Sequence, residues 1–368
     1  MIDKRLLKRF DYGLLILVVI ISCIGIIIIS SATNSTSAEA KDYYYVKMQL
    51  MWFAVGLAAM LVAISIDYRV IGKYVNIIYV INIIFLLVVF FAGKSAKGAT
   101  RWIMIGPFRF QPSEFAKIAT ILTLAKYIEK KEGNINDIKE LLLALLYVGF
   151  PIILIMKQPD LGSSMVLLAI FFVMMFAGGA NIKLLSGLIL SGVLLAPIAW
   201  FSLEGFQKKR ILVFLNPNMD PLGAGYHVIQ SKIAVGSGGL LGKGLYRGTQ
   251  NQLQFLPEQH TDFIFSVLGE ELGFIGGILL LVLYLFLILR MLNIASKSKD
   301  LYGMLIIVGV ITMFTFHIFI NIGMTIGIMP ITGLPLPFMS YGGSSFITNM
   351  IAVGLVLNVG MRRYKILF

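Results

Sequence analysis

Asp262 is the residue in this sequence best placed to do chemistry, because it stands where a polar, basic loop meets a strongly apolar segment. The segment continues through VLGEELGFIGGILLLVLYLFLIL to Arg290, which is long enough to span a bilayer. A carboxylate at the mouth of a membrane helix is costly to keep without a function. In that place it could act as a general base and accept a proton from a reacting hydroxyl group.

A second pair of charges, Glu114 and Lys117, lies at the start of another apolar run. Pro112 just before them predicts a helix start, with the acid placed favourably near the helix N-terminus. Lys117 follows Glu114 by one turn, so both side chains share one face of that helix. They are either a simple ion pair within the helix or charges kept inside a membrane for a function. Asp160 adds a further carboxylate in the turn KQPD.

Residues 202–262 form a long basic segment that invites an anionic partner. Arg210 ends the run QKKR, while Lys243 and Arg247 lie among closely spaced glycines. Backbone amides freed by glycine can cradle phosphate oxygens beside such bases. The segment is not a P-loop, because a glycine follows Lys243 where serine or threonine is required. Upstream, YHVIQSKIAVGSGGL predicts a short amphipathic surface helix. The plain alternative is that these bases only contact lipid headgroups.

The segment MPITGLPLPFMSYGGSS, residues 329–345, interrupts the chain between its last two apolar runs. Three prolines prevent a helix there, and Ser344 and Ser345 then open the final run. Irregular backbone at membrane depth is tolerated only where protein or a cavity covers it. The segment therefore predicts a lined pocket, with a re-entrant structural turn as the alternative.

Composition places these residues in a helical membrane protein. The chain is 58% hydrophobic and 13% charged, with a mean hydropathy of +0.89. Soluble domains carry about a quarter charged residues, so an ordinary soluble enzyme is excluded. A bilayer core needs roughly 20 apolar residues per helix, and about ten such runs are present. We expect an all-α, polytopic membrane protein with a single domain over residues 1–368. The runs lie near residues 12–31, 46–66, 74–93, 113–128, 140–156, 163–178, 182–201, 263–289, 302–325 and 341–361.

The distribution of Lys and Arg predicts the orientation of these runs. With both termini on the cytoplasmic side, more than half of the 31 basic residues fall in short inner segments. The long loop 202–262 and the segment 93–117, which we expect to be an ordered, glycine-containing loop leading into the fourth helix, then lie outside. Cys23 is the only cysteine, so no disulfide can form within the chain. The three histidines lack metal-ligand spacing, and a divalent cation is left open as a cofactor.

Two kinds of protein could use acids, bases and broken backbone on one face. A transporter binds its solute midway across the membrane. An enzyme acting on a lipid-linked substrate needs a carboxylate base and cations that hold a pyrophosphate. The charges gather at one surface here, while the mid-span residues are almost all apolar apart from His317, which we expect to pack or form a hydrogen bond. This asymmetry favours the enzyme.

Four long motifs, in the right order, carry a resemblance that covers essentially the whole chain. They are QPSEFAK at 111–117, KQPDLGSS at 157–164, HTDFIFSVLGEELG at 260–273 and TGLPLPFMSYGGSS at 332–345. They resemble the shape, elongation, division and sporulation (SEDS) family. The short N-terminus and the wording of the last motif favour the elongation member over the division and sporulation members.

The resemblance implies a bacterial peptidoglycan glycosyltransferase with ten transmembrane helices in the cytoplasmic membrane. Such proteins polymerise Lipid II, an undecaprenyl-pyrophosphate-linked disaccharide pentapeptide, together with a class B penicillin-binding protein. Other elongation-complex membrane proteins and membrane lipids are further expected partners, and nucleic acid is not. A Lipid II flippase, a scaffold, and a division or sporulation paralogue are the alternatives.

The resemblance also implies roles for individual residues. Asp262 matches the essential aspartate of the family, and Glu114 and Lys117 match its charged pair. Asp160 and Arg210 match other functionally sensitive positions. The full set of expected substrate-binding residues is Glu114, Lys117, Asp160, Arg210, Lys243, Arg247, Ser344 and Ser345, with Asp262 as the catalytic residue.

Overall fold

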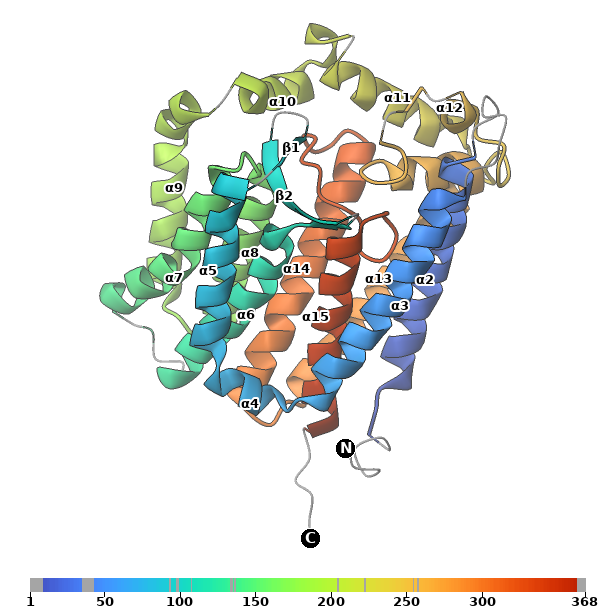
Figure 1. Ribbon diagram of the computed structural model, residues 1–368. Coiled ribbons are helices and arrows are strands. Elements are labelled where there is room, and N and C mark those ends of the chain that lie inside the picture. The colour runs from blue at the N-terminus through green and yellow to red at the C-terminus, as the bar shows by residue number, and fades with distance from the viewer. Residues whose placement is uncertain are drawn as a thin grey trace.

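The apolar runs of the sequence form long helices that stand side by side in one bundle (Figure 1). The structure is a computed structural model. It describes residues 9–34, 43–92, 94–96, 99–106, 108–132, 135, 137–203, 205–221, 223–253, 255–256 and 258–362. The long helices are α2 (Tyr12–Ala32), α3 (Tyr44–Ser65), α5 (Val75–Ala92), α6 (Pro112–Lys130), α7 (Ile138–Met156), α8 (Leu161–Ala177), α9 (Ile182–Ser202), α13 (Ile264–Ser296), α14 (Leu301–Thr325) and α15 (Gly343–Arg362).

Each of these helices overlaps one of the predicted runs, so the helical membrane class is confirmed. Six of them, α2, α3, α7, α13, α14 and α15, are long and apolar enough to cross a membrane. Three more, α5, α8 and α9, contain shorter apolar stretches, Val75–Phe91, Leu161–Ala177 and Ile182–Ile198, and α6 carries several charges. The number of about ten spans therefore stays a prediction.

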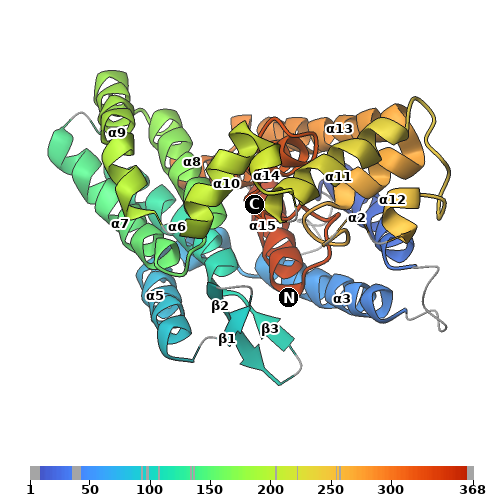
Figure 2. The same ribbon diagram turned by 90° about the horizontal axis from the view of Figure 1, so that it is seen from above.

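Short elements cover the two ends of the bundle. At one end lie α10 (Gly205–Leu215), η1 (Pro217–Met219), α11 (Ala224–Ser237) and α12 (Thr249–Gln252), all from the long basic segment. Figure 1 shows α10 to α12 crossing this end above the long helices, and Figure 2 shows them from above. The predicted short helix is thus present as α11. It rests on protein, because Ser231 shares a hydrogen bond of 2.7 Å with Ser266 of α13.

A small sheet at the same end was not predicted, because the segment 93–117 was expected to be an ordered loop that leads into the fourth helix. The strands β1 (Lys94–Ala96), β2 (Ala99–Ile105) and β3 (Phe108–Phe110) pair antiparallel in that order. Gly106, with φ of +61°, supplies the left-handed backbone needed at the turn between β2 and β3. The β-branched and aromatic residues of this stretch suit a strand. The sheet leads into α6, where Pro112 is the first helical residue as predicted.

The centre of the bundle is formed by α14 and α15. In these helices 67% and 83% of the membrane-crossing stretch is buried by protein, against 22% in α13. Close packing of α15 on α3 depends on small residues. A Cβ atom on Gly354 would lie 2.9 Å from the carbonyl oxygen of Met60, and one on Gly56 would lie 2.9 Å from the Met350 side chain.

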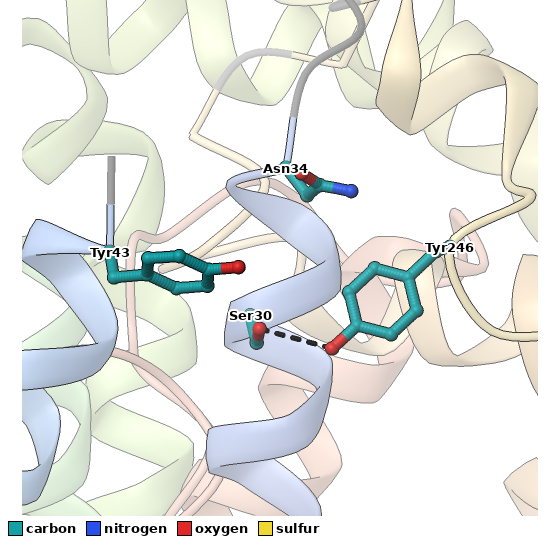
Figure 3. Close-up of a pocket in the computed structure, with 4 residues that line it drawn as sticks. All are labelled: Ser30, Asn34, Tyr43 and Tyr246. Atoms are coloured by element: carbon teal, nitrogen blue, oxygen red, sulfur yellow. Dashed lines mark hydrogen bonds between the residues drawn. The ribbon is translucent and has the colours of Figure 1, made fainter. Parts of the chain in front are cut away.

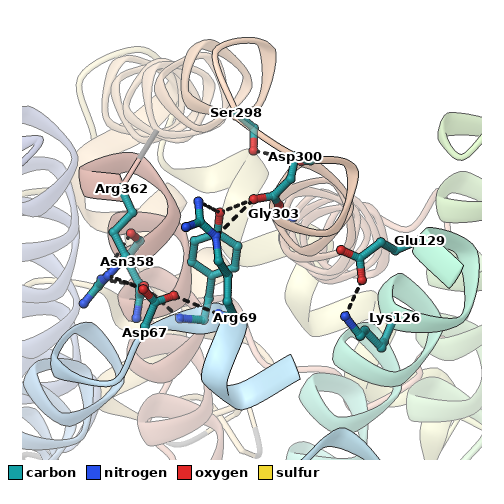
Figure 4. A network of polar contacts seen from close by, with 10 residues as sticks. Asp67, Arg69, Lys126, Glu129, Ser298, Asp300, Gly303, Asn358 and Arg362 are labelled. Atoms are coloured by element: carbon teal, nitrogen blue, oxygen red, sulfur yellow. Dashed lines mark hydrogen bonds and ion pairs between the residues drawn. The ribbon is translucent and has the colours of Figure 1, made fainter. Parts of the chain in front are cut away.

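At the opposite end, polar contacts tie α4 (Tyr68–Lys73) to α14 and α15 (Figure 4). Arg362 pairs with Asp67 at 3.3 Å, and Arg69 pairs with Asp300 at 3.4 Å. The Tyr68 hydroxyl donates to Asp300 over 2.5 Å. Burial and then the Asp300 hydrogen bond raise the pKa of Tyr68, so the phenol keeps the proton that it donates. These contacts fix the turn between α3 and α5.

Helix α13 is broken at Gly273, whose φ is +66°. A glycine-rich segment, residues 239–244, packs into this break and replaces the lost helical hydrogen bonds. Lys243 and Gly244 donate backbone N–H groups to the carbonyls of Glu270 and Glu271, each over 3.0 Å. In return Phe274 donates to the carbonyl of Gly239 over 2.9 Å. The break is thus fully bonded, as irregular backbone at membrane depth must be.

Gly242→Ala should destabilise the protein by about 2 kcal/mol or more, because φ of +77° is strained for alanine. Its Cβ would also lie only 2.1 Å from the Glu271 carbonyl oxygen. Thermal unfolding of the detergent-solubilised protein measures the effect. Gly236→Ala in α11 is the control, because a Cβ there meets nothing within 4 Å. Equal unfolding temperatures for the two variants would contradict the role given to this segment.

Candidate active site

Asp262 lies two residues before α13, with its backbone position fixed from α14. The carbonyl of Asp262 accepts a 3.0 Å hydrogen bond from the side-chain amide of Asn321. The same amide donates to the carbonyl of Leu334 over 2.8 Å, and Asn321 is fully buried. One carboxylate oxygen lies 3.5 Å from the place of a Cβ on Gly333. A half-buried carboxylate is therefore held against the irregular segment between α14 and α15.

That irregular segment, residues 326–342, is buried or half-buried except at Ile326 and Ile328. The lined pocket expected at residues 329–345 stays a prediction. Neighbouring elements satisfy the backbone of the segment. The hydroxyl of Tyr284 donates to the carbonyl of Pro337 over 2.6 Å. Tyr341 donates its N–H to the carbonyl of His260 over 2.9 Å, and the Ser340 hydroxyl donates to Thr261 over 2.6 Å. The two residues before Asp262 are thus joined to the segment by hydrogen bonds.

Glu114 and Lys117 form the predicted ion pair, with 2.7 Å between Nζ and Oε1. The pair is almost completely buried, since Glu114 is 2% and Lys117 1% exposed. Lys117 Nζ also lies 3.1 Å from Nε2 of His317 in α14. The other ring nitrogen of His317 is 3.0 Å from the carbonyl of Pro335. His317 is therefore a hydrogen-bonded residue, as expected, and it connects the ion pair to the irregular segment.

Asp160 is the N-cap of α8, where it accepts hydrogen bonds from the N–H and the hydroxyl of Ser163 at 3.2 and 2.9 Å. Arg101 of β2 lies 3.7 Å from the same carboxylate. Arg101 also donates to the carbonyl of Gln158 over 3.2 Å. The sheet thus brings a guanidinium to the Asp160 turn. Sequence reasoning missed Arg101, because only the alternation of residues 99–105 could have indicated the strand that places it.

Arg210 of α10 is the third element of this charged group. Burial lowers the pKa of Arg210 from its ordinary value, and the neighbouring charge of Arg101 lowers it further. The charges of Asp262 and Asp160 act in the opposite direction. Arginine keeps its proton in proteins, so two guanidinium groups are held close enough to repel each other. An anionic ligand between them would relieve that repulsion.

Ser344 lies at the start of α15 and joins it to the sheet. Its hydroxyl donates to the carbonyl of Arg109 over 3.2 Å and accepts from the N–H of Gln111 over 3.1 Å. Ser345, one residue on, is half-buried. Ser344 therefore has a clear structural task between β3 and α15.

Lys243 and Arg247 belong to a different group of contacts, around the break in α13. Lys243 Nζ lies 2.7 Å from Glu270, whose side chain is fully buried, and 2.9 Å from the hydroxyl of Thr249. Arg247 is exposed. The backbone N–H groups of Lys243 and Gly244 already bond to α13, so they are not free to cradle phosphate as the sequence suggested. Both residues are thus weaker substrate candidates than Arg210.

The described part of the chain places no group of three or more His, Cys, Asp or Glu side chains where they could hold a metal ion. The charged group at the end of the bundle covered by α10 consists of acids and guanidiniums. Such side chains can bind an anion and accept a proton.

A protein-family model for the FtsW, RodA and SpoVE proteins, described as "Cell cycle protein", matches residues 12–365. The chain belongs to this family. The peptidoglycan glycosyltransferase MrdB of Escherichia coli strain K12 is 41% identical over 338 residues, which cover 92% of this chain and 91% of that protein.

Two solved structures are also similar. One, from work on the structural coordination of polymerization and crosslinking by a peptidoglycan synthase complex, has a TM-score of 0.82 and 34% identity. It covers 97% of this chain and 99% of that one. The other is the rod shape determining protein RodA of Thermus thermophilus, with a TM-score of 0.73 and 30% identity over 97% of this chain and 98% of that one. The family and the helical fold predicted from the motifs are therefore confirmed.

Glu114 and Lys117 should behave as a coupled pair. Removing one partner leaves the other charge buried and unpaired, which is expected to lower the free energy of unfolding by roughly 3–5 kcal/mol. The double variant Glu114→Gln/Lys117→Met should lose much less than the sum of the two single variants. Thermal unfolding measures this coupling.

The pair Lys126–Glu129 is the matched control, with the same spacing in the same helix but side chains 27% and 31% exposed. Its coupling should be below about 1 kcal/mol. Simple additivity at Glu114 and Lys117 would show that their contact does not stabilise the fold.

Proposed function

We propose that this membrane protein is a peptidoglycan glycosyltransferase that polymerises Lipid II at the outer face of the cytoplasmic membrane during cell elongation. The observation that carries the proposal is the convergence of Arg101 and Arg210 on a site that also holds Asp160 and Asp262. Similarity to MrdB and RodA supports the reaction and the elongation role. A division role, as in FtsW, is the second candidate, because relatives of that name are 38% identical.

The reaction joins the sugar of one lipid-linked substrate to a hydroxyl group of another. Asp262 accepts the proton of the attacking hydroxyl as that oxygen bonds to the anomeric carbon. The bond from this carbon to the pyrophosphate breaks on the opposite face. One carboxylate is enough for this inverting transfer, because pyrophosphate leaves without needing a strong acid.

The departing pyrophosphate needs cations where its negative charge develops. Arg210 and Arg101 can supply them, because a guanidinium can grip phosphate oxygens through two parallel hydrogen bonds. Asp160 would hold Arg101 in place, because the Asp160 carboxylate lies close to Arg101 and is itself fixed by the N-cap hydrogen bond of α8. Lys117 and Glu114 would stabilise the site indirectly. Lys117 contacts His317, and His317 contacts the irregular segment against which Asp262 lies.

The same proposal includes partners and orientation. The structural relative from a peptidoglycan synthase complex supports a class B penicillin-binding protein as a partner of this chain. Helix α2 begins and α15 ends at the same end of the bundle (Figure 1), which fits an even number of spans with both termini in the cytoplasm. Residues 1–8 and 363–368, which hold several of the inner basic residues, lie outside the described residues.

Polymer formation separates this proposal from a Lipid II flippase. Purified protein in detergent, with its proposed partner and Lipid II, should make glycan polymer although no gradient exists. Movement of Lipid II across vesicle membranes without any polymer would favour the flippase.

Asp262→Asn should lower the rate of polymerisation by about 10²–10⁴-fold, because the amide cannot accept the proton. The rate of Lipid II consumption by purified protein measures the effect, and the unfolding temperature should stay unchanged. Asp137→Asn is the control, since Asp137 caps α7 and asparagine caps a helix equally well. Near-normal polymerisation by Asp262→Asn would rule out the general-base role.

Arg210→Ala should impair the use of Lipid II, and Arg210→Lys should impair it less, because lysine makes only a point contact to phosphate. Lys208→Ala and Lys209→Ala are controls on the same helix. Contact with lipid headgroups alone predicts mild and equal effects for all these positions. Normal polymerisation by Arg210→Ala would show that this residue does not hold the pyrophosphate.

A further inference from the structure

Three rings pack together on α3 and on the two segments that meet at Asp262. The ring centroids of Tyr45 and His260 are 4.5 Å apart, and those of Tyr45 and Tyr341 are 5.2 Å apart. His260 and Tyr341 complete the group at 5.7 Å. His260 precedes Asp262 by only two residues, and the group is half-buried. These side chains form an aromatic wall on the segments that carry Asp262 and bond to its neighbours.

The aromatic wall continues along the first residues of α3. Tyr44 packs edge-on against Tyr45, with 5.5 Å between the centroids. Tyr43, the N-cap residue of α3, comes next. Tyr43 and Tyr44 are 50% and 51% exposed, so they do not serve the hydrophobic core. Consecutive exposed tyrosines thus lead away from Asp262.

Tyr43 also lines a cavity of about 230 Å³ with Ser30, Asn34 and Tyr246 (Figure 3). Liquid water occupies about 30 Å³ per molecule, so the cavity has room for a group the size of a sugar ring. The two tyrosines face each other across it, and the Tyr246 hydroxyl lies 3.1 Å from that of Ser30. Among the residues that the structure describes, its lining offers rings, hydroxyl groups and an amide, and no charged side chain.

The backbone of Tyr246 shows that this wall of the cavity is held in place. Its φ is +62°, a left-handed conformation that is strained for an aromatic residue. The N–H of Tyr246 donates to the hydroxyl of Ser31 over 3.2 Å. Asn251 donates its side-chain amide to the carbonyl of the same serine over 2.9 Å. Such strain persists where the surroundings fix it, and it often marks a binding site.

We propose that a tyrosine track binds the growing glycan strand as it leaves Asp262, an inference that rests on the proposed polymerase function. The track consists of Tyr341, His260, Tyr45, Tyr44, Tyr43 and Tyr246. A sugar ring presents an apolar C–H face that packs on an aromatic ring, while its hydroxyl and N-acetyl groups form hydrogen bonds. Ser30 and Asn34 supply partners for those groups in the cavity.

The chemistry of the lining separates this occupant from others. A phosphate group would need cations, and the four described residues of the lining include none. An acyl chain would leave the hydroxyl and amide groups of the lining without partners. Anchoring in lipid headgroups, the usual task of tyrosines at a membrane interface, does not require them to enclose a cavity. An uncharged saccharide satisfies both the rings and the polar groups.

A track that holds the product keeps the strand at the site between additions, so it should set how long the strands grow. The double variant Tyr43→Ala/Tyr246→Ala should shorten them, because each lost ring contact shortens the residence of the strand roughly two- to tenfold. The mean strand length made from Lipid II by the purified complex is the measurement, compared at equal substrate consumption.

Tyr74→Ala is the matched control, because Tyr74 is similarly exposed, at 55%, but caps α4 at the opposite end of the bundle. It should give strands of normal length. Tyr43→Phe/Tyr246→Phe keeps both rings and should also give long strands. Equal shortening by the phenylalanine and alanine double variants would overturn the ring-stacking role.

Direct binding gives a second readout that does not depend on catalysis. A soluble β-1,4-linked N-acetylglucosamine tetrasaccharide should bind the wild-type protein, by calorimetry, more tightly than it binds the alanine double variant. Equal binding and equal strand length for the wild-type protein and the alanine double variant would overturn the proposal. If the tyrosines only anchor the protein in lipid, the double variant should show that result together with a lowered unfolding temperature. Failure of the wild-type protein to make any polymer would instead contradict the proposed function.

Discussion

A charge inside an apolar bundle must be paired, and this constraint governs the arrangement around the proposed site. The ammonium of Lys117 is 1% exposed and can stay charged only with close partners. Glu114 provides the opposite charge from the same helix, and His317 provides a second contact from α14. The relative position of α6 and α14 is therefore set by a polar contact as well as by packing.

The same face of α14 fixes the backbone of Asp262, the proposed base. His317 and Asn321 are four residues apart, so their side chains lie one above the other on the helix. His317 contacts Lys117 and the carbonyl of Pro335, whereas Asn321 donates to the carbonyls of Leu334 and Asp262. A shift of α14 would disturb the ion pair and Asp262 together. The Glu114–Lys117 pair and Asp262 are thus both positioned by contacts with α14, although they are far apart in sequence.

The sequence predicted what depends on local patterns. Apolar runs predicted the long helices, Pro112 predicted the start of α6, and the spacing of Glu114 and Lys117 predicted their ion pair. Long-range pairing could not be read in this way. Arg101 reaches Asp160 only because a small sheet forms, and a short alternating stretch does not reveal its neighbours. Likewise, the sequence around Lys243 cannot distinguish a lysine that binds phosphate from one that pairs with Glu270, as the structure shows.

The two ends of the bundle use charge differently, and the difference suits a polymerase. At the end near α4, Asp67 pairs with Arg362 and Asp300 pairs with Arg69, so opposite charges from neighbouring helices hold each other. At the other end, Arg210 is held where Arg101 repels it. Repulsion of this kind is maintained where a ligand uses it. A site that must grip a pyrophosphate, release it, and grip the next one needs cations that are held in place by the fold, and Asp160 holds Arg101 in this way. The rigid contacts at the α4 end and the fixed irregular segment supply that support.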